Sequence, residues 1–431
     1  MANVLVEENS LSDIANAIRE KNGSNATYKP AQMASAIRAI EGGGGTAEEP
    51  VLTTLEITQN GVYIPGEGVD GFSSVTVNVP SADIEKGVVV NATDTNGNWT
   101  DIVVYGDFSA TMFKGNTTLQ KVRFVGVKSI PANAFDGCKA LTSVSIPDEV
   151  TSIGNYAFYG CTALTSVQLP SGITTIGQYT FYNCNKLTSV SIPEGVTSIA
   201  QYAFRNCTSL AELTLPSTLK TIANDAFHTC TSLKSVTIPA NVTSIGAAAF
   251  YSGGLTDVYW NARACTSCGN RSYPAFGNCT ALTNFVIAAD VQSLPTFMCR
   301  NCTSLTSVVI PGSVTSIGTD AFLGCTSLAS LTINDGVTSI GEYSFYQCYA
   351  LTSVAIPDSV TSIGNYAFGS CTALASVQIG ETENCAISTI SSSAFNSDTA
   401  LTNITIYKTA DSVSGSPWGG TSATVTWALD E

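Results

Sequence analysis

Apolar and polar positions along this chain follow a pattern that returns about every 23 residues. Each unit opens on a leucine, and successive units match in register, as Leu141 to Cys161 and Leu164 to Cys184 do. The opening leucines are Leu119, Leu141, Leu164, Leu187, Leu210, Leu233, Leu255, Leu282, Leu305, Leu328, Leu351, Leu374 and Leu401. A fixed period of this length is the sequence signature of a repeat protein whose units form successive turns.

The unit has the form L-x-x-V-x-I-P-x-x-V-x-x-I-G-x-x-A-F-x-x-C. In the unit that opens at Leu141, Val144 and Ile146 stand two residues apart, so they share one face of a short strand while Ser145 faces solvent. Pro147 lacks an N–H and ends that strand. The chain then returns and closes the turn through Val150, Ile153, Ala157, Phe158 and Cys161.

One such turn cannot cover its own apolar side, so we expect the turns to stack and bury a continuous core. With ~4.8 Å between neighbouring strands, about thirteen turns would make a rod of roughly 60 Å. The sequence therefore predicts a mainly β repeat solenoid over residues 117–407. Terminal caps are expected in such folds, and we place them at residues 83–116 and 408–431. The strands predicted to shield the two ends lie at residues 88–90, 102–105, 404–406 and 425–427.

Three smaller segments precede the array, namely a helical module at 1–41, a glycine-rich linker at 42–50 and a small β module at 51–82. In the helical module, Ser10 with Asp13 makes a helix-start signal, and Pro30 opens a second helix. In the β module, Asn60-Gly61 between two alternating stretches predicts a hairpin.

Composition and charge narrow the class of protein. Hydrophobic residues make up 44% of the chain and charged residues only 12%, a balance that argues against a disordered chain. The net charge is −15 without a basic cluster, whereas nucleic-acid binding needs a basic footprint. No apolar run is long enough to insert into a membrane, and Met1 to Glu20 lacks the pattern of a secretory signal. We therefore expect no nucleic-acid partner and no membrane insertion. We expect the protein either to stay inside the cell or to leave it by a route other than a cleaved signal, such as release inside a virus particle.

The unit LTSVSIPEGVTSIAQYAFRNC, which opens at Leu187, resembles the BspA-like leucine-rich repeats of bacterial surface proteins. The resemblance covers about Leu119 to Ile406, and it rests on seven positions that recur in register. It implies a leucine-rich-repeat solenoid and a role in adhesion or host contact. Members of that family carry no shared catalytic residues, so the resemblance implies none here.

The flanking segments resemble a different group of proteins. LSDIANAIREKNG and LEITQNGVYIPGEGVDGFSSVTVNVP look like the N-terminal part of tail-associated proteins of phages and prophages of Gram-positive gut bacteria, and SGSPWGGTSATVTW is similar to their tail-end segment. This resemblance implies a receptor-binding or host-contact protein of the virion tail, made in the bacterial cytoplasm. Its N-terminal modules would join other tail components. Whether the chain forms a homo-oligomer stays open. The alternative is a bacterial cell-surface adhesin or interaction protein, with modules that join surface components.

Ten of the 14 cysteines stand at the last position of the unit: Cys138, Cys161, Cys184, Cys207, Cys230, Cys279, Cys302, Cys325, Cys348 and Cys371. Stacked turns would hold neighbours ~5 Å apart, within disulfide reach by distance. Parallel side chains in register give a poor Cβ–S–S–Cβ torsion, however, and a thiol packs well as a small hydrophobe. We therefore expect a buried ladder of reduced thiols, which suits assembly in a reducing cytoplasm.

Metal binding and catalysis have little support in the sequence. The pairs Cys265/Cys268 and Cys299/Cys302 have zinc-type spacing, but Cys302 already belongs to the ladder and a shared zinc would break the stack. We predict no metal and no cofactor, and leave open whether Cys265 and Cys268 pair. The single histidine, His228, is predicted to be a surface residue, and the acids stand singly at variable positions. The chain is therefore predicted not to be an enzyme.

Candidate binding residues concentrate in one irregular unit. The outward strand positions are mostly small and uncharged, whereas binding hot spots favour Trp, Tyr and Arg. The longer unit from Leu255 to Cys279 is the exception, with Tyr259, Trp260, Arg263, Arg271 and Tyr273. Insertions in repeats often map to the binding face, so these five are candidates for contact with a host cell-surface protein or glycan. The alternative is a tolerated loop in which Trp260 fills the core Ile position.

Two rows of tyrosines also recur, Tyr156, Tyr179, Tyr202, Tyr343 and Tyr366 in one and Tyr159, Tyr182, Tyr251 and Tyr346 in the other. Tyrosine presents a broad amphipathic face that suits sugars or proteins. The alternative, which we favour, is edge stacking between identical turns. The regular repeats are thus predicted to serve mainly as a rigid scaffold, with specificity in the unit from Leu255 to Cys279.

Overall fold

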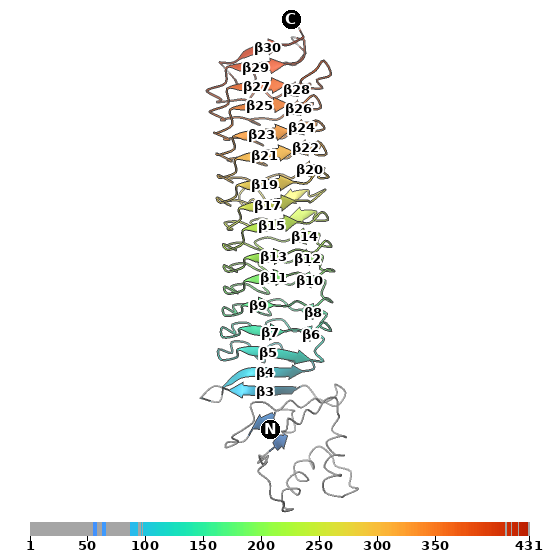
Figure 1. Cartoon of the computed structure of the whole chain (residues 1–431), viewed down its shortest axis with the longest axis vertical. Helices are drawn as coiled ribbons and strands as arrows, with labels where there is room; N and C mark the ends of the chain where they lie inside the picture. Colours follow the sequence, from blue (N-terminus) through green and yellow to red (C-terminus); the bar gives the residue numbers. More distant parts are fainter. Residues whose placement is uncertain are drawn as a thin grey trace, which may run out of the picture.

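The structure is a computed structural model, and it describes residues 55–57, 63–65, 87–93, 96, 98–409, 412–414, 416–420 and 422–429. The predicted helical module at 1–41 and linker at 42–50 lie outside the described residues, as does most of the β module at 51–82. The described part of the chain contains strands and turns and no α-helix, and so no helix that could cross a membrane. Its turns stack along one axis into a straight rod (Figure 1).

The stack begins with an antiparallel pair of strands. Strand β3 (Gly87–Thr93) pairs antiparallel with β4 (Trp99–Tyr105), and β4 then pairs in parallel with the first repeat strand. Ahead of them, β1 (Leu55–Ile57) and β2 (Tyr63–Pro65) pair antiparallel, so the predicted hairpin pairing is confirmed. At the other end, β30 (Thr424–Trp427) pairs in parallel with the last repeat strand.

Each repeat turn contributes one strand to a first row along the rod, and each except the last contributes one strand to a second row. The first row consists of β5 (Lys121–Val125), β7 (Ser143–Ser145), β9 (Ser166–Val167), β11 (Ser189–Ser191), β13 (Glu212–Thr214), β15 (Ser235–Ile238), β17 (Asp257–Trp260), β19 (Asn284–Ile287), β21 (Ser307–Ile310), β23 (Ser330–Ile333), β25 (Ser353–Ile356), β27 (Ser376–Ile379) and β29 (Asn403–Ile406). These are thirteen strands, as predicted, and β30 adds a fourteenth.

The second row holds shorter strands, at the V-x-x-I part of the unit. It consists of β6 (Ser129–Ile130), β8 (Ser152–Ile153), β10 (Thr175–Ile176), β12 (Ser198–Ile199), β14 (Thr221–Ile222), β16 (Ser244–Ile245), β18 (Ser267–Cys268), β20 (Ser293–Leu294), β22 (Ser316–Ile317), β24 (Ser339–Ile340), β26 (Ser362–Ile363) and β28 (Thr389–Ile390). The figure shows both rows running along the rod (Figure 1).

The register between strands of neighbouring turns follows the repeat, so residues at equivalent positions of successive units pair with each other. Ile310 pairs with Ile333 in the first row and Ile340 with Ile363 in the second. Along β21, Ser307 and Val309 are exposed while Val308 and Ile310 are buried, which confirms the predicted alternation. Because the strands pair in parallel and in register, the residues at any one position of the repeat unit form a ladder along the rod, either inside it or on its surface.

The core contains a ladder of phenylalanines and a ladder of cysteines. Rings of successive Phe residues, from Phe113 to Phe276 and from Phe322 to Phe395, stack with centroids 5.1–5.8 Å apart. All 14 cysteines are buried free thiols, so the predicted ladder is confirmed. Each ladder thiol donates to a carbonyl of the preceding turn, as the Cys184 Sγ does to the Phe158 oxygen at 3.2 Å.

The phenylalanine ladder is interrupted at Cys299, which occupies the Phe position of its turn. The gap is filled from the first-row strands, where Phe285 replaces the usual Val and Trp260 the usual Ile. The Phe285 ring lies 6.1 Å from that of Phe276 and 6.4 Å from that of Phe322, and the Trp260 ring lies 6.2 Å from that of Phe285. Two enlarged side chains thus compensate for one reduced one, which keeps the core dense.

Candidate ligand-binding site

The surface of interest lies on the segment that follows each second-row strand, which we call the arm (residues 154–161 in the unit of Leu141). In most arms the residue before the Ala-Phe pair and the residue after it are partly exposed, and these two positions carry the tyrosine rows. Ala248 and Asp320 stand at the first of these positions but are buried. Tyr156, Tyr179 and Tyr202 lie 4.6 Å apart between ring centroids, and Tyr159 lies 4.9 Å from Tyr182. Stacking between successive turns is therefore confirmed for these tyrosines, but the rings lie face to face and not edge to face as predicted.

The first of the two outward positions has a left-handed backbone. Tyr156, Tyr179, Tyr202, Tyr343 and Tyr366 all have φ between 52° and 61°. This region is unfavourable for bulky residues, so the stacked turns must hold the backbone there. The bonds that do so are regular, since the N–H of Tyr156 donates to the Gln178 carbonyl and that of Phe158 to the Thr180 carbonyl.

The irregular unit interrupts both outward rows at once. Pro274 and Gly277 occupy the two positions, and neither carries a side chain that projects like tyrosine. A Cβ on Gly277 would lie 2.7 Å from Pro274 Cγ and 3.0 Å from Tyr251 Cδ2, so only glycine lets the Tyr251 ring lie across this turn. A hollow of about 330 Å³ results, lined by Tyr251, Arg271, Ser272, Pro274, Asn278, Arg300 and Asn301.

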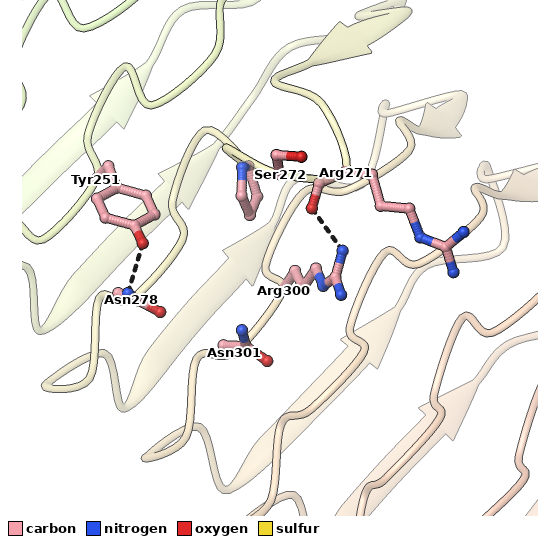
Figure 2. Close-up of a pocket in the computed structure, with 7 residues that line it drawn as sticks. Tyr251, Arg271, Ser272, Asn278, Arg300 and Asn301 are labelled. Carbon is pink, nitrogen blue, oxygen red and sulfur yellow. Dashed lines mark hydrogen bonds between the residues drawn. The ribbon is translucent and has the colours of Figure 1, made fainter.

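The lining groups come from three successive turns and converge on the hollow (Figure 2). The Asn278 amide Nδ2 donates to the Tyr251 hydroxyl at 2.6 Å. The Arg300 Nη1 donates to the main-chain carbonyl of Arg271. The Arg300 side chain is 24% exposed, and its buried Nε has no partner. The hollow therefore offers amide, hydroxyl and guanidinium groups around an aromatic wall.

A buried carboxylate lies close to both arginines. Asp320 is fully buried, with its Oδ2 3.4 Å from the Arg271 Nε and 3.6 Å from the Arg300 Nη1. Burial raises the pKa of the Asp320 carboxyl, and the two guanidiniums oppose that rise. The Arg271 guanidinium also lies over the Tyr343 ring, 5.7 Å from its centroid. In Figure 2 the Arg271 side chain extends away from Tyr251 and Asn278, so Arg300 is the guanidinium nearest the centre of the hollow.

The five residues predicted from the sequence do not form one cluster. Tyr259 is 40% exposed on the outer face of β17, and Arg263 pairs with Asp290 at 2.5 Å just after that strand. Arg271 and Tyr273 instead follow β18, in the other row, where Arg271 lines the hollow. The Tyr273 ring lies 6.3 Å from that of Tyr251 and is 56% exposed.

The prediction that Trp260 belongs to the binding surface is wrong. Its side chain is fully buried, in register between Ile238 and Ile287, so it fills the core Ile position as the alternative interpretation held. The reason is the alternation of the strand, which points Tyr259 outward and the next residue inward. A buried indole cannot contact a partner, and the binding role of the other four residues stays a prediction.

Sequence reasoning missed Tyr251, Asn278, Arg300 and Asn301 as one group. They belong to three different units, and only stacking brings them together. A signal was present, because Pro274 and Gly277 stand where most units carry bulky outward residues. Aligning the units by arm position would have revealed the gap and its neighbours.

The cysteines of the irregular region are core residues. Cys268 occupies the inward Ile position of β18 and pairs in register with Ile245, and Cys265 is fully buried beside it. Both are free thiols, and burial raises the pKa of Cys265 to about 11. Within the described residues no three His, Cys, Asp or Glu side chains are grouped so as to hold a metal ion.

His228 lies next to the hollow and not within it. Its side chain is 19% exposed, stacks on the Tyr251 ring at 5.6 Å and bonds through Nδ1 to the Thr229 hydroxyl at 2.6 Å. Burial lowers the pKa of its imidazole, Arg205 adds to this effect and Asp225 opposes it. The predicted surface location is thus partly right, since the ring packs against its neighbours.

Comparison with known proteins identifies the repeats. The model of the BspA type leucine rich repeat region matches residues 128–256, 197–328 and 292–421. No curated protein matches the chain. Similar solved structures include a leucine rich cell surface protein from Faecalibacterium prausnitzii A2-165, with 27% identity, coverage of 86% of this chain and 97% of the other, and a TM-score of 0.38.

Two further solved structures are bacterial leucine-rich repeat proteins. The one from Bacteroides ovatus ATCC 8483 shares 23% identity over 80% of this chain and 98% of its own, with a TM-score of 0.41. The one from Eubacterium ventriosum ATCC 27560 shares 24% identity over 63% of this chain and 90% of its own, with a TM-score of 0.36. Since the family model matches well over half of its length, the chain belongs to the BspA type leucine rich repeat family.

Proposed function

We propose that this chain is a non-enzymatic binding protein that contacts a glycan on a host surface through the hollow beside Tyr251. The observation that carries the proposal is the hollow itself, a polar concavity lined by residues of three successive turns. Small-molecule sites are concave and combine a few convergent polar groups with apolar walls. Here Tyr251 and Pro274 supply the walls, and Asn278, Asn301 and Arg300 supply polar groups.

The regular turns support this role as a rod. Their outward first-row side chains are mostly small and polar, as Ser145, Ser191 and Thr237 are, and they offer few anchor groups for a partner. Stacking in register makes each turn depend on its neighbours, which favours a stiff spacer. The rod would then hold the hollow at a distance from the point of attachment.

The experiment is binding of the labelled full chain to a glycan array and to host cells. Binding to a defined set of glycans, lost when glycosidases trim the cells, supports the proposal. Binding that survives complete removal of glycans contradicts it. Absence of binding to every glycan and every host cell tested also contradicts it.

A second candidate, contact with a host cell-surface protein, is favoured by an apolar stripe on the first-row face. Tyr259, Val286 and Val309 are 40%, 43% and 55% exposed and lie outward on three consecutive turns. Thr237 and Thr332 flank the stripe on the neighbouring turns. A contiguous patch of exposed apolar side chains marks an interaction site. Threonine at all three positions would abolish cell binding if this stripe were the contact, and would leave glycan binding unchanged.

The setting of the protein follows from the N-terminal segments, which we propose to attach it to a larger assembly. Their resemblance to tail-associated proteins favours a phage or prophage tail, and the repeat family favours a bacterial cell surface. Immunogold labelling of intact cells and of purified particles from the source bacterium separates the two. Label confined to cells would exclude the tail, and light scattering of the full chain would show whether it forms a homo-oligomer.

A further inference from the structure

The charged residues that line the hollow are basic, whereas the chain as a whole is acidic. The chain has 33 acidic and 18 basic residues, yet the seven residues that line the hollow include two arginines and no acid. Asp320, fully buried, lies close to both arginines, and Glu342 is near enough to raise the pKa of Asp320, but neither acid lines the hollow. The charged groups of the lining itself are therefore all positive, and this favours an anionic group in the ligand.

Arg300 has the geometry to receive such a group. A guanidinium presents five N–H donors, and Nη1 of Arg300 already donates to the Arg271 carbonyl. That bond holds the guanidinium at the edge of the hollow. Arginine binds carboxylates through paired N–H groups, and a guanidinium held in advance loses little freedom when it does so.

The remaining lining suits a sugar ring. Tyr251 and Tyr273 present aromatic faces, the second of them 56% exposed at the rim. Asn278, Asn301 and Ser272 bring amide and hydroxyl groups that can donate to and accept from sugar hydroxyls. A volume of about 330 Å³ lies at the small end of ligand sites, so it admits a single sugar residue more readily than a polypeptide segment.

We infer that the hollow binds a sugar residue that carries a carboxylate, with the carboxylate on Arg300 and the ring against Tyr251. The inference rests on the proposed function and specifies its ligand class. A neutral sugar would leave the Arg300 charge without a counterion in the hollow. A simple carboxylate would make no use of the aromatic wall or the amides.

The test is binding of glucuronic acid, glucose and acetate to the full chain, measured by saturation-transfer NMR and titration calorimetry. Glucuronic acid should bind at least about tenfold more tightly than either of the others, because only it satisfies both halves of the site. Its affinity should fall as salt is added. Equal binding of glucose and glucuronic acid, or of acetate and glucuronic acid, overturns the inference.

Two variants locate the site. Arg300→Gln should lose at least about tenfold in affinity for glucuronic acid. Asn278→Asp is a second variant that we expect to fold like the parent chain. Asn278 is exposed and has φ of 55°, and aspartate has the same size and tolerates that conformation. It places a negative charge in the hollow and should also abolish the preference for the acidic sugar. Unchanged binding in folded Asn278→Asp overturns the inference.

Arg123→Gln is the matched control, because Arg123 lies on the exposed face of β5, near Asp101, and does not line the hollow. It should bind glucuronic acid like the parent chain. Failure of the inference is separable from failure of the proposed function. If glycan arrays remain positive and Asn278→Asp leaves them unchanged, the glycan site lies elsewhere on the rod. If arrays and cells are both negative, the proposed function fails as well.

Discussion

The backbone N–H of Cys371 donates a 2.7 Å hydrogen bond to Oδ1 of Asp398, which stands where earlier turns carry a ladder cysteine. Asp398 is only 6% exposed, and its Oδ2 has no partner. Burial raises the pKa of this carboxyl to about 8, and the Cys371 N–H opposes the rise. The folded chain therefore retains a proton that the unfolded chain releases at a lower pH.

Stability should fall as pH rises from about 4 to about 8, because the native state binds more protons than the unfolded state over that interval. Asp398→Asn keeps the shape and the acceptor oxygen but cannot ionise. It should be more stable than the parent by an amount on the order of a few kcal/mol near pH 9, and similar near pH 4. Urea unfolding at both pH values measures this, with exposed Glu149→Gln as control. Parallel loss of stability in parent and Asp398→Asn would refute the assignment.

The thiols should be almost inert in the folded chain. Burial raises the pKa of Cys138 and Cys230 to about 12 and that of Cys265 to about 11, so little thiolate exists near neutral pH. We expect reaction with Ellman's reagent at about pH 8 to be at least ~100-fold slower in the native protein than in guanidinium chloride, where all 14 should react. Fast modification of several thiols in the native state would contradict the buried ladder.

The effects of substitutions at Arg300 and Asp320, which form an ion cluster with Arg271, should depend strongly on each other. Arg300→Met leaves the buried Asp320 with Arg271 as its remaining cationic partner, and we expect a loss of about 2–4 kcal/mol. Asp320→Asn removes the buried charge, and asparagine tolerates the φ of 56° at that position. The double variant should therefore recover most of the loss. A double-mutant cycle by chemical denaturation measures the coupling, and additive effects would show that the charges are independent.

Backbone strain in the tyrosine rows should be visible in a pair of variants at Tyr179. Its φ is 55°, and its ring stacks on Tyr156 and Tyr202 at 4.6 Å each. Tyr179→Ala and Tyr179→Asn both remove the stack, but asparagine tolerates the left-handed region better. The Asn variant should be the more stable of the two by roughly 0.5–1 kcal/mol. Equal melting curves would indicate that the stacked turns impose no strain at this residue.

The regular part of the fold could be predicted from the sequence because each inward position repeats. Ile153 and Phe158 recur in register, and parallel stacking adds no information beyond the repeat. The hollow could not be predicted in the same way, since Tyr251, Asn278 and Arg300 meet only after three units are stacked. Residue type alone also misled at Trp260, because an aromatic residue suits a binding surface and a core equally well.

The exchange of volume among Trp260, Phe285 and Cys299 lies beyond single-sequence reasoning for a related reason. Each is unusual at its own position, and the three compensate one another across neighbouring turns. Cys299→Phe restores the repeat residue but should overpack the core, at a cost of about 1–3 kcal/mol, because Phe285 already fills the gap. In the Phe285→Val background the same change should fit the regular ladder. The double variant should then be more stable than the sum of the single effects by at least about 1 kcal/mol, as measured by urea unfolding. Additive effects would mean that Phe285 does not occupy the space left by Cys299.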